Sequence, residues 1–101
     1  MSTTRAQIET ILRQQRPYLA AKYGVRRIGL FGSFVHGAPD EASDVDIVVE
    51  FAQPIGLRFV ELAEYLEQLL GRKVDILTPD GIQGIRVPGV ADSIRASTVY
   101  V

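Results

Sequence analysis

The sequence contains no cysteine, which excludes disulfide bonds, zinc–thiolate sites and thiol nucleophiles. Long apolar runs are also missing, since none approaches the ~20 residues that a membrane span needs. The first residues, 1–5, lead into a polar amphipathic stretch rather than the apolar core of a signal peptide. We therefore expect a cytoplasmic protein without a membrane partner.

An excess of positive charge is lacking as well. The 11 lysines and arginines are outnumbered by 12 aspartates and glutamates, which leaves a net charge of −1 with histidine neutral. Dedicated nucleic-acid binders draw most of their affinity from basic side chains that neutralise phosphates. We therefore expect no DNA partner, and any other contact with nucleic acid would have to be local.

The length of 101 residues predicts one domain, spanning residues 1–101, with a single core. This length leaves no room for a second domain that could enclose a substrate, so a large acceptor would have to bring its own binding surface. The sequence is compatible with a homo-oligomer but does not specify one.

Hydrophobic periodicity, together with proline and glycine positions, predicts the secondary structure. Pro17 disfavours helical geometry at the preceding residue, so a break is expected there, followed by a short helix that buries Tyr18, Leu19 and Tyr23. Residues 78–81 form a turn-like cluster. Helices are expected at 4–15, 17–22, 57–70 and 89–96, and strands at 25–31, 44–51, 72–77 and 98–101. This order predicts an α/β or α+β fold with helices covering a small mixed β-sheet.

The most informative feature is a pair of aspartates, Asp44 and Asp46, at the start of the second predicted strand. Carboxylates at positions i and i+2 of a strand project from the same face, so both can reach one divalent ion. Such oxygen ligands suit Mg²⁺ or Mn²⁺, which commonly take one or two protein carboxylates and complete their shells with water and substrate phosphates. A solvated strand face is the alternative interpretation of the pair.

A third aspartate, Asp75, lies in the next predicted strand. The alternation there assigns Val74 and Ile76 to the core and Asp75 to the opposite face. If that face is shared with Asp46, two ions could sit ~3.5–4 Å apart and bind the attacking and leaving oxygens of a phosphoryl transfer. Taken alone, Asp75 could equally be a charge that protects an edge strand from aggregation.

Gly32 and Ser33 lie where the first strand ends and a turn begins. Backbone N–H groups at such a turn, with the Ser33 hydroxyl, can bind phosphate oxygens, and the missing side chain of Gly32 permits close approach. A lone Gly-Ser pair is an ordinary turn signal. Four fixed residue types at this spacing, however, should occur by chance in a chain of this length with a probability on the order of 10⁻³.

The pattern Gly32-Ser33, ten residues, Asp44-x-Asp46 is similar to the signature of the polymerase-β-like nucleotidyltransferase superfamily. The strings Gly-Ser-Phe-Val-His-Gly at 32–37 and Ser-Asp-Val-Asp-Ile-Val-Val at 43–49 resemble its minimal nucleotidyltransferase branch, as do residues 71–79 and 98–101. The resemblance implies the fold of that superfamily and a reaction that moves AMP from ATP onto a hydroxyl group.

The resemblance also implies roles for individual residues. Ser33 would contact the triphosphate, Asp44 and Asp46 would bind the metal, and Asp75 would be the third carboxylate, which helps to hold the catalytic ion and activates the acceptor hydroxyl. Members of this branch are commonly antitoxins paired with a helical HEPN ribonuclease toxin, which they can silence by adenylating a tyrosine. A HEPN toxin is therefore the expected partner.

The sequence departs from that branch at His36, where many members carry arginine. A neutral imidazole lacks the permanent charge and the two-pronged geometry of guanidinium, although a nearby triphosphate could raise its pKa. His36 is therefore a candidate nucleotide contact, with an ordinary loop residue as the alternative. The missing charge could come from other basic residues, none of which is singled out by its spacing: Arg26, Arg27, Arg72, Lys73 and Arg86.

Two further functions remain open from the sequence. The chain could be an antitoxin that inhibits by binding alone and retains its carboxylates without using them. Alternatively, it could transfer a nucleotide to a small hydroxyl compound, although enzymes of that kind usually need an additional domain to bind the compound.

Overall fold

The computed structural model describes residues 4–32, 35 and 44–101. Its helices and strands follow the predicted order, with one additional short helix. In chain order they are α1 (Arg5–Tyr23), β1 (Val25–Phe31), β2 (Val45–Phe51), α3 (Arg58–Leu70), β3 (Val74–Leu77), α4 (Pro79–Gln83), α5 (Val90–Ser97) and β4 (Val99–Tyr100).

The first helix is continuous, so the predicted break at Pro17 is wrong. Thr4 caps α1 in a reciprocal capping box with Gln7, and the helix ends at Gly24, which adopts a left-handed φ of 69°. Proline cannot donate the usual backbone hydrogen bond, but one apolar stripe of α1 remains buried on both sides of Pro17. Burial of this stripe offsets the lost bond.

Within α1, the prediction that Tyr18, Leu19 and Tyr23 are all buried holds for only two of them. Leu19 and Tyr23 are buried, whereas Tyr18 is 41% exposed. Tyr18 still packs against Tyr23 and against Tyr65 of α3, with ring centroids 6.5 and 5.2 Å apart. The exposed tyrosine therefore helps to join the two long helices at their outer surface.

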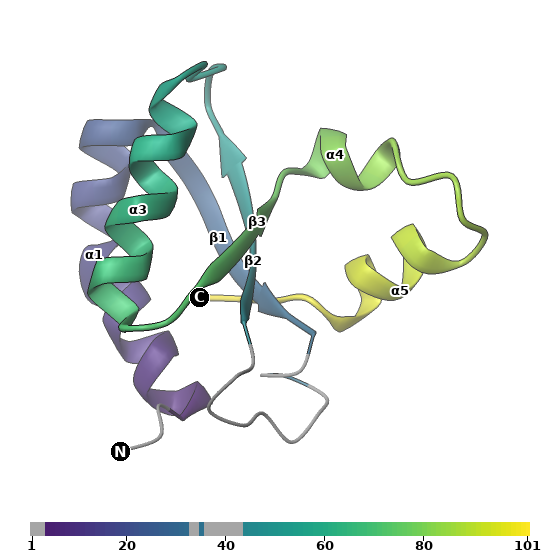
Figure 1. The fold of residues 1–101 in the computed structure, drawn as a ribbon, viewed down its shortest axis with the longest axis horizontal. Coiled ribbons are helices and arrows are strands. Elements are labelled where there is room, and N and C mark those ends of the chain that lie inside the picture. Colours follow the sequence, from purple (N-terminus) through teal and green to yellow (C-terminus); the bar gives the residue numbers. More distant parts are fainter. Residues whose placement is uncertain (1–3, 33–34, 36–43) are drawn as a thin grey trace.

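The four strands form one mixed sheet in the order β3-β2-β1-β4. β2 runs parallel to β3, whereas β1 is antiparallel to both β2 and β4. Figure 1 shows α1 and α3 together on one side of this sheet and α4 and α5 on the other side. The expected fold, a small mixed sheet flanked by helices, is confirmed.

Each face of the sheet has its own group of buried side chains. The main core lies between the sheet and the helices α1 and α3, and it includes Val45, Ile47 and Val49 of β2. On the opposite face a smaller cluster joins Phe31, Val48 and Ile82. Because α4 and α5 are short, this second face is only partly covered, and we call it the open face.

The segment after β3 also differs from the prediction. Residues 78–81 were expected to form a turn, but they begin the helix α4. The Thr78 hydroxyl accepts a hydrogen bond of 3.1 Å from the backbone N–H of Gly81, and Pro79 occupies the first turn, where its missing N–H costs nothing. Across the described ranges, no helix is both long and apolar enough to cross a membrane.

Candidate active site

The two strand aspartates lie side by side on the open face. Asp46 of β2 and Asp75 of β3 are register partners in the parallel pair. Paired residues on neighbouring strands project to the same side of a sheet. The same register rule applies to Phe31, which pairs with Asp46 from β1 and belongs to the open-face cluster. The fold therefore brings two carboxylates from separate strands to one surface.

Asp46 has the perturbed electrostatics of a functional carboxyl group. Partial burial raises its pKa above the usual 3.8, and the nearby charges of Asp75 and Asp44 raise the pKa further. Asp44, which directly precedes β2, is exposed. The charges of Asp44 and Asp75 therefore disfavour the ionised form of Asp46, and a cation bound beside it would favour that form.

Gly32 ends β1 directly against the Asp46 carboxylate. A Cβ atom at position 32 would lie 3.0 Å from the Asp46 carboxyl carbon and would overlap one of its oxygens. The backbone φ of Gly32 is +74°, which L-amino acids with side chains rarely adopt. The Asp46 carboxylate therefore requires glycine at position 32. This requirement is separate from the predicted close approach of a phosphate group.

The turn after β1 carries the remaining predicted nucleotide contacts. The carbonyl of Gly32 accepts a hydrogen bond of 3.0 Å from the backbone N–H of Val35, so a tight turn begins at the end of the strand. Ser33 and His36 lie outside the described residues. Their roles as nucleotide contacts remain predictions.

The described carboxylates have the chemistry of a magnesium site that is completed by a substrate. No set of three or more acidic, histidine or cysteine side chains in the described ranges is arranged to hold a metal ion. The pair Asp46 and Asp75 nevertheless fits Mg²⁺, because this ion commonly binds through one or two carboxylates and takes its other ligands from water and phosphates. The donor set is therefore suited to a metal–nucleotide complex rather than to a resident structural metal.

Basic residues are distributed unevenly around these carboxylates. Arg26 and Arg27 both pair with Glu50, at 3.8 and 3.0 Å, four residues along β2 from Asp46. Both arginines therefore bind Glu50, which lies about 13 Å along the strand from Asp46. Lys73 is closer, because it precedes β3 at the same parity as Asp75 and its carbonyl accepts a hydrogen bond from Val45. Lys73 is therefore a candidate source of positive charge near the carboxylates.

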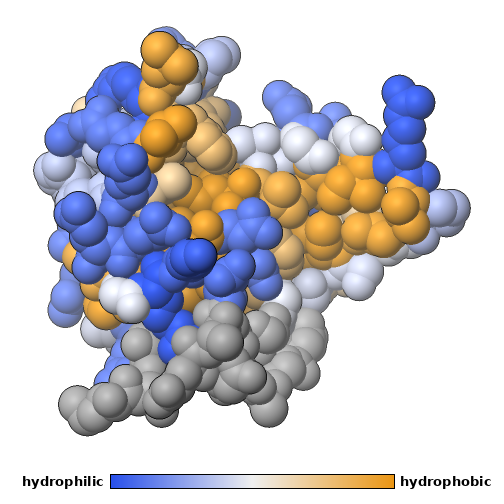
Figure 2. All heavy atoms as spheres, viewed as in Figure 1, coloured by the Kyte–Doolittle hydropathy of each residue, from blue (hydrophilic) through white to orange (hydrophobic). Residues whose placement is uncertain are grey.

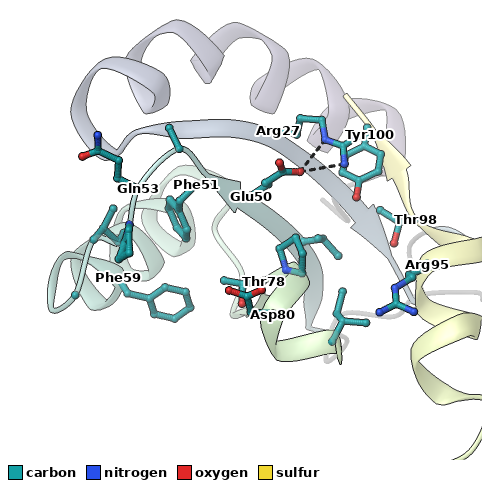
Figure 3. Close-up of a pocket in the computed structure, with 17 residues that line it drawn as sticks. Arg27, Glu50, Phe51, Gln53, Phe59, Thr78, Asp80, Arg95, Thr98 and Tyr100 are labelled. Carbon is teal, nitrogen blue, oxygen red and sulfur yellow. Dashed lines mark hydrogen bonds and ion pairs between the residues drawn. The ribbon is translucent and has the colours of Figure 1, made fainter. Parts of the chain in front are cut away.

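A groove on the open face was not predicted from the sequence. It has a volume of about 730 Å³ and lies between the second half of β2, the turn that leads to α3, the helix α4 and the end of the chain. In Figure 3, Phe51 and Phe59 lie at one end, and Glu50, Arg27 and Tyr100 lie together at another. In the sequence, Phe51 and Phe59 are spaced like ordinary core residues. Only the tertiary arrangement shows that they line a groove.

These features agree with comparisons to known proteins. A family model described as the nucleotidyltransferase domain matches residues 12–101. Protein adenylyltransferase MntA of Thermococcus cleftensis is 43% identical over 99 residues, which cover 97% of this chain and 96% of the relative. A Methanocaldococcus jannaschii relative, provisionally named a protein adenylyltransferase, is 43% identical over 101 residues, with 97% and 98% covered.

The chain belongs to the nucleotidyltransferase domain family and is an enzyme of that class. It falls in the minimal branch of that family. A solved structure assigned provisionally as a minimal nucleotidyltransferase superposes with a TM-score of 0.67 at 31% identity, covering 94% of this chain and 89% of that one. A toxin–antitoxin complex with AMP-PNP shares the fold, with a TM-score of 0.63 at 23% identity, covering 97% of this chain and 72% of that one.

Proposed function

We propose that this chain transfers AMP from ATP onto a hydroxyl group of a separate protein, and that the acceptor is a toxin that the transfer silences. The observation that carries this proposal is the pairing of Asp46 with Asp75 on the open face of a nucleotidyltransferase domain. The relative from Thermococcus cleftensis is named a protein adenylyltransferase, which supports a protein acceptor.

The chemistry follows from the placement of the carboxylates. Asp44 and Asp46 would hold Mg²⁺, which neutralises charge on the phosphates and on the leaving group. Asp75 would accept the proton of the acceptor hydroxyl as its oxygen attacks the α-phosphorus. The bond between the α-phosphorus and the bridging oxygen breaks, and pyrophosphate leaves with that electron pair. Gly32, Ser33 and His36 would bind the triphosphate at the end of β1.

The acceptor is a tyrosine of a HEPN-family toxin in this proposal. A phenolic hydroxyl at the end of a long side chain can reach carboxylates that lie on an open face. In this proposal the partner supplies the surface that completes the site on the open face. The partner and the tyrosine rest on the resemblance to the minimal branch.

An antitoxin that acts by binding alone is the second candidate. It is favoured by the exposed apolar side chains of Leu57 and Val60, which could contact a protein partner without any transfer. The two functions differ in their product, because only the enzyme leaves a covalent adenylate on the partner.

The test combines this chain with the protein of the neighbouring reading frame, labelled ATP and Mg²⁺. We expect a partner adduct of one or more AMP units that survives denaturation and maps to a tyrosine by mass spectrometry. An unmodified partner, neutralised equally well by the chain and by its Asp46→Asn variant, would establish the binding-only antitoxin instead. A neighbour with an Arg-x4-His motif would support the HEPN assignment.

A further inference from the structure

The open-face groove begins where the carboxylates end. Val48, two residues beyond Asp46 on the same face of β2, lies in its floor, and Thr78, three residues beyond Asp75, lies in its wall. β2 and the segment that directly follows β3 therefore lead from the carboxylates into the groove. Its volume of about 730 Å³ is large enough for several side chains of a bound molecule.

Three of the four charged residues that line the groove are paired within the chain, and the fourth, Asp80, lies in the first turn of α4. The Arg27 guanidinium lies 3.0 Å from the Glu50 carboxylate and stacks 4.2 Å from the centre of the Tyr100 ring. At the opposite wall, Arg95 lies 3.5 Å from Asp92. An acidic occupant would have to compete with Glu50 for Arg27 and would meet the Asp80 carboxylate, so the groove disfavours acidic side chains.

The end of the groove near α3 is apolar and extends onto the surface. Phe51 and Phe59 pack edge to face with ring centroids 6.3 Å apart. Beside them, the large apolar side chains of Leu57 and Val60 are 92% and 58% exposed. Figure 2 shows apolar residues next to the N-terminal end of α3 and across the centre of the open side. Aromatic pockets with an exposed apolar border are typical of surfaces that bind proteins.

We propose that this groove binds an apolar segment of the acceptor protein and thereby positions its hydroxyl at Asp46 and Asp75. The inference rests on the proposed function, because it assumes a protein acceptor. Phe51, at the apolar end of the groove, lies five residues or about 17 Å along β2 from Asp46. An extended segment spans that length with about five residues. The anchoring apolar side chain therefore lies about five residues from the hydroxyl that is modified.

The test compares groove variants with matched controls outside it. Phe59→Ala removes an aromatic ring from the groove, and Tyr18→Ala removes a partly exposed ring from α1, on the other face of the sheet. Ala52→Arg places a long charged side chain at the exposed rim of the groove, and Ala21→Arg places it on the surface of α1. Thermal unfolding of each variant reports whether it is folded, and Ala52→Arg removes no packed side chain.

The readouts are the Kd for the protein of the neighbouring reading frame, the KM for that protein in AMP transfer, and the Kd for ATP. We expect Phe59→Ala and Ala52→Arg to weaken partner binding and raise the KM by about tenfold or more, with both controls and all ATP affinities within about twofold of the unsubstituted chain. Partner binding that weakens although no AMP is transferred would support the groove while contradicting the proposed function.

Four outcomes would overturn the groove assignment. The acceptor does not bind in the groove if folded Phe59→Ala and Ala52→Arg keep normal partner affinity and KM. The same conclusion follows if the unsubstituted chain does not bind the partner. Loss of ATP affinity alone would assign the groove to the nucleoside. A dimer of this chain in ultracentrifugation that dissociates on Phe59→Ala would assign it to a second copy.

Discussion

The Asp46 carboxylate occupies the space in which a side chain of residue 32 would lie. A Cβ atom there would come within 3.0 Å of the Asp46 carboxyl carbon, and the left-handed φ of Gly32 adds backbone strain for any other residue. The turn that precedes the predicted phosphate contacts and the strand that carries the carboxylates are therefore sterically coupled.

This coupling predicts a specific effect of Gly32→Ala. The variant should lose about 1–2 kcal/mol of stability from the left-handed backbone, and it should also lose most AMP transfer because Asp46 is displaced. The matched control is Gly71→Ala, where φ is +68° and no atom lies within 4 Å of the added Cβ. Urea unfolding and transfer rates should show similar destabilisation in both variants but lost activity only in Gly32→Ala. Equal activity in the two would contradict the coupling.

Substitution of Asp46 by asparagine should abolish catalysis without unfolding the chain. The amide is nearly isosteric but binds a hard dication poorly, so we expect AMP transfer to fall by about 100-fold or more. Mg²⁺ with a non-hydrolysable ATP analogue should raise the Tm of the unsubstituted chain but not that of Asp46→Asn. Full transfer by a folded Asp46→Asn preparation would refute the assignment.

The raised pKa of Asp46 predicts how stability depends on pH in the presence of a chelator. Because the folded pKa lies above the unfolded value of 3.8, the native state binds more protons between these two values, so the free energy of unfolding decreases as pH rises through the folded pKa. Asp46→Asn should remove this decrease and be more stable than the unsubstituted chain at neutral pH. Urea unfolding from about pH 3 to about pH 7 measures the effect.

Asp75→Asn provides the control for this pH dependence. Since the Asp75 charge is one cause of the raised pKa, its removal should shift the decrease in stability to lower pH without abolishing it. Identical pH profiles in Asp75→Asn and the unsubstituted chain would show that the two carboxylates do not interact.

Lys73 is expected to support nucleotide binding through its charge. Lys73→Gln should weaken ATP affinity by several-fold, with a smaller effect at high salt, because Lys73 lies two residues before Asp75 and its positive charge would attract the triphosphate. The control is Arg86→Gln, which removes an exposed positive charge from the connection between α4 and α5. Calorimetric titration with ATP and Mg²⁺ distinguishes the two, and equal losses would indicate only a general effect of net charge.

The local patterns in the sequence predict much of the fold. The strands β1, β2 and β3 and the helix α3 lie within two residues of their predicted ranges. A helix break at Pro17 and a turn at 78–81 were predicted wrongly, because both predictions used only the local residue types. Burial of the apolar stripe keeps α1 continuous through Pro17, and the cap by Thr78 starts the helix α4.

The sequence alone determined which face of its strand each carboxylate occupies, because side-chain alternation is a property of the strand itself. The tertiary structure decided that Asp46 and Asp75 are register partners and that Gly32 meets the Asp46 carboxylate. It also created the groove from β2, α4 and the chain end. Both the strand register and the groove depend on contacts between segments that are distant in the sequence. Such contacts are set by the packing of the whole domain rather than by local spacing.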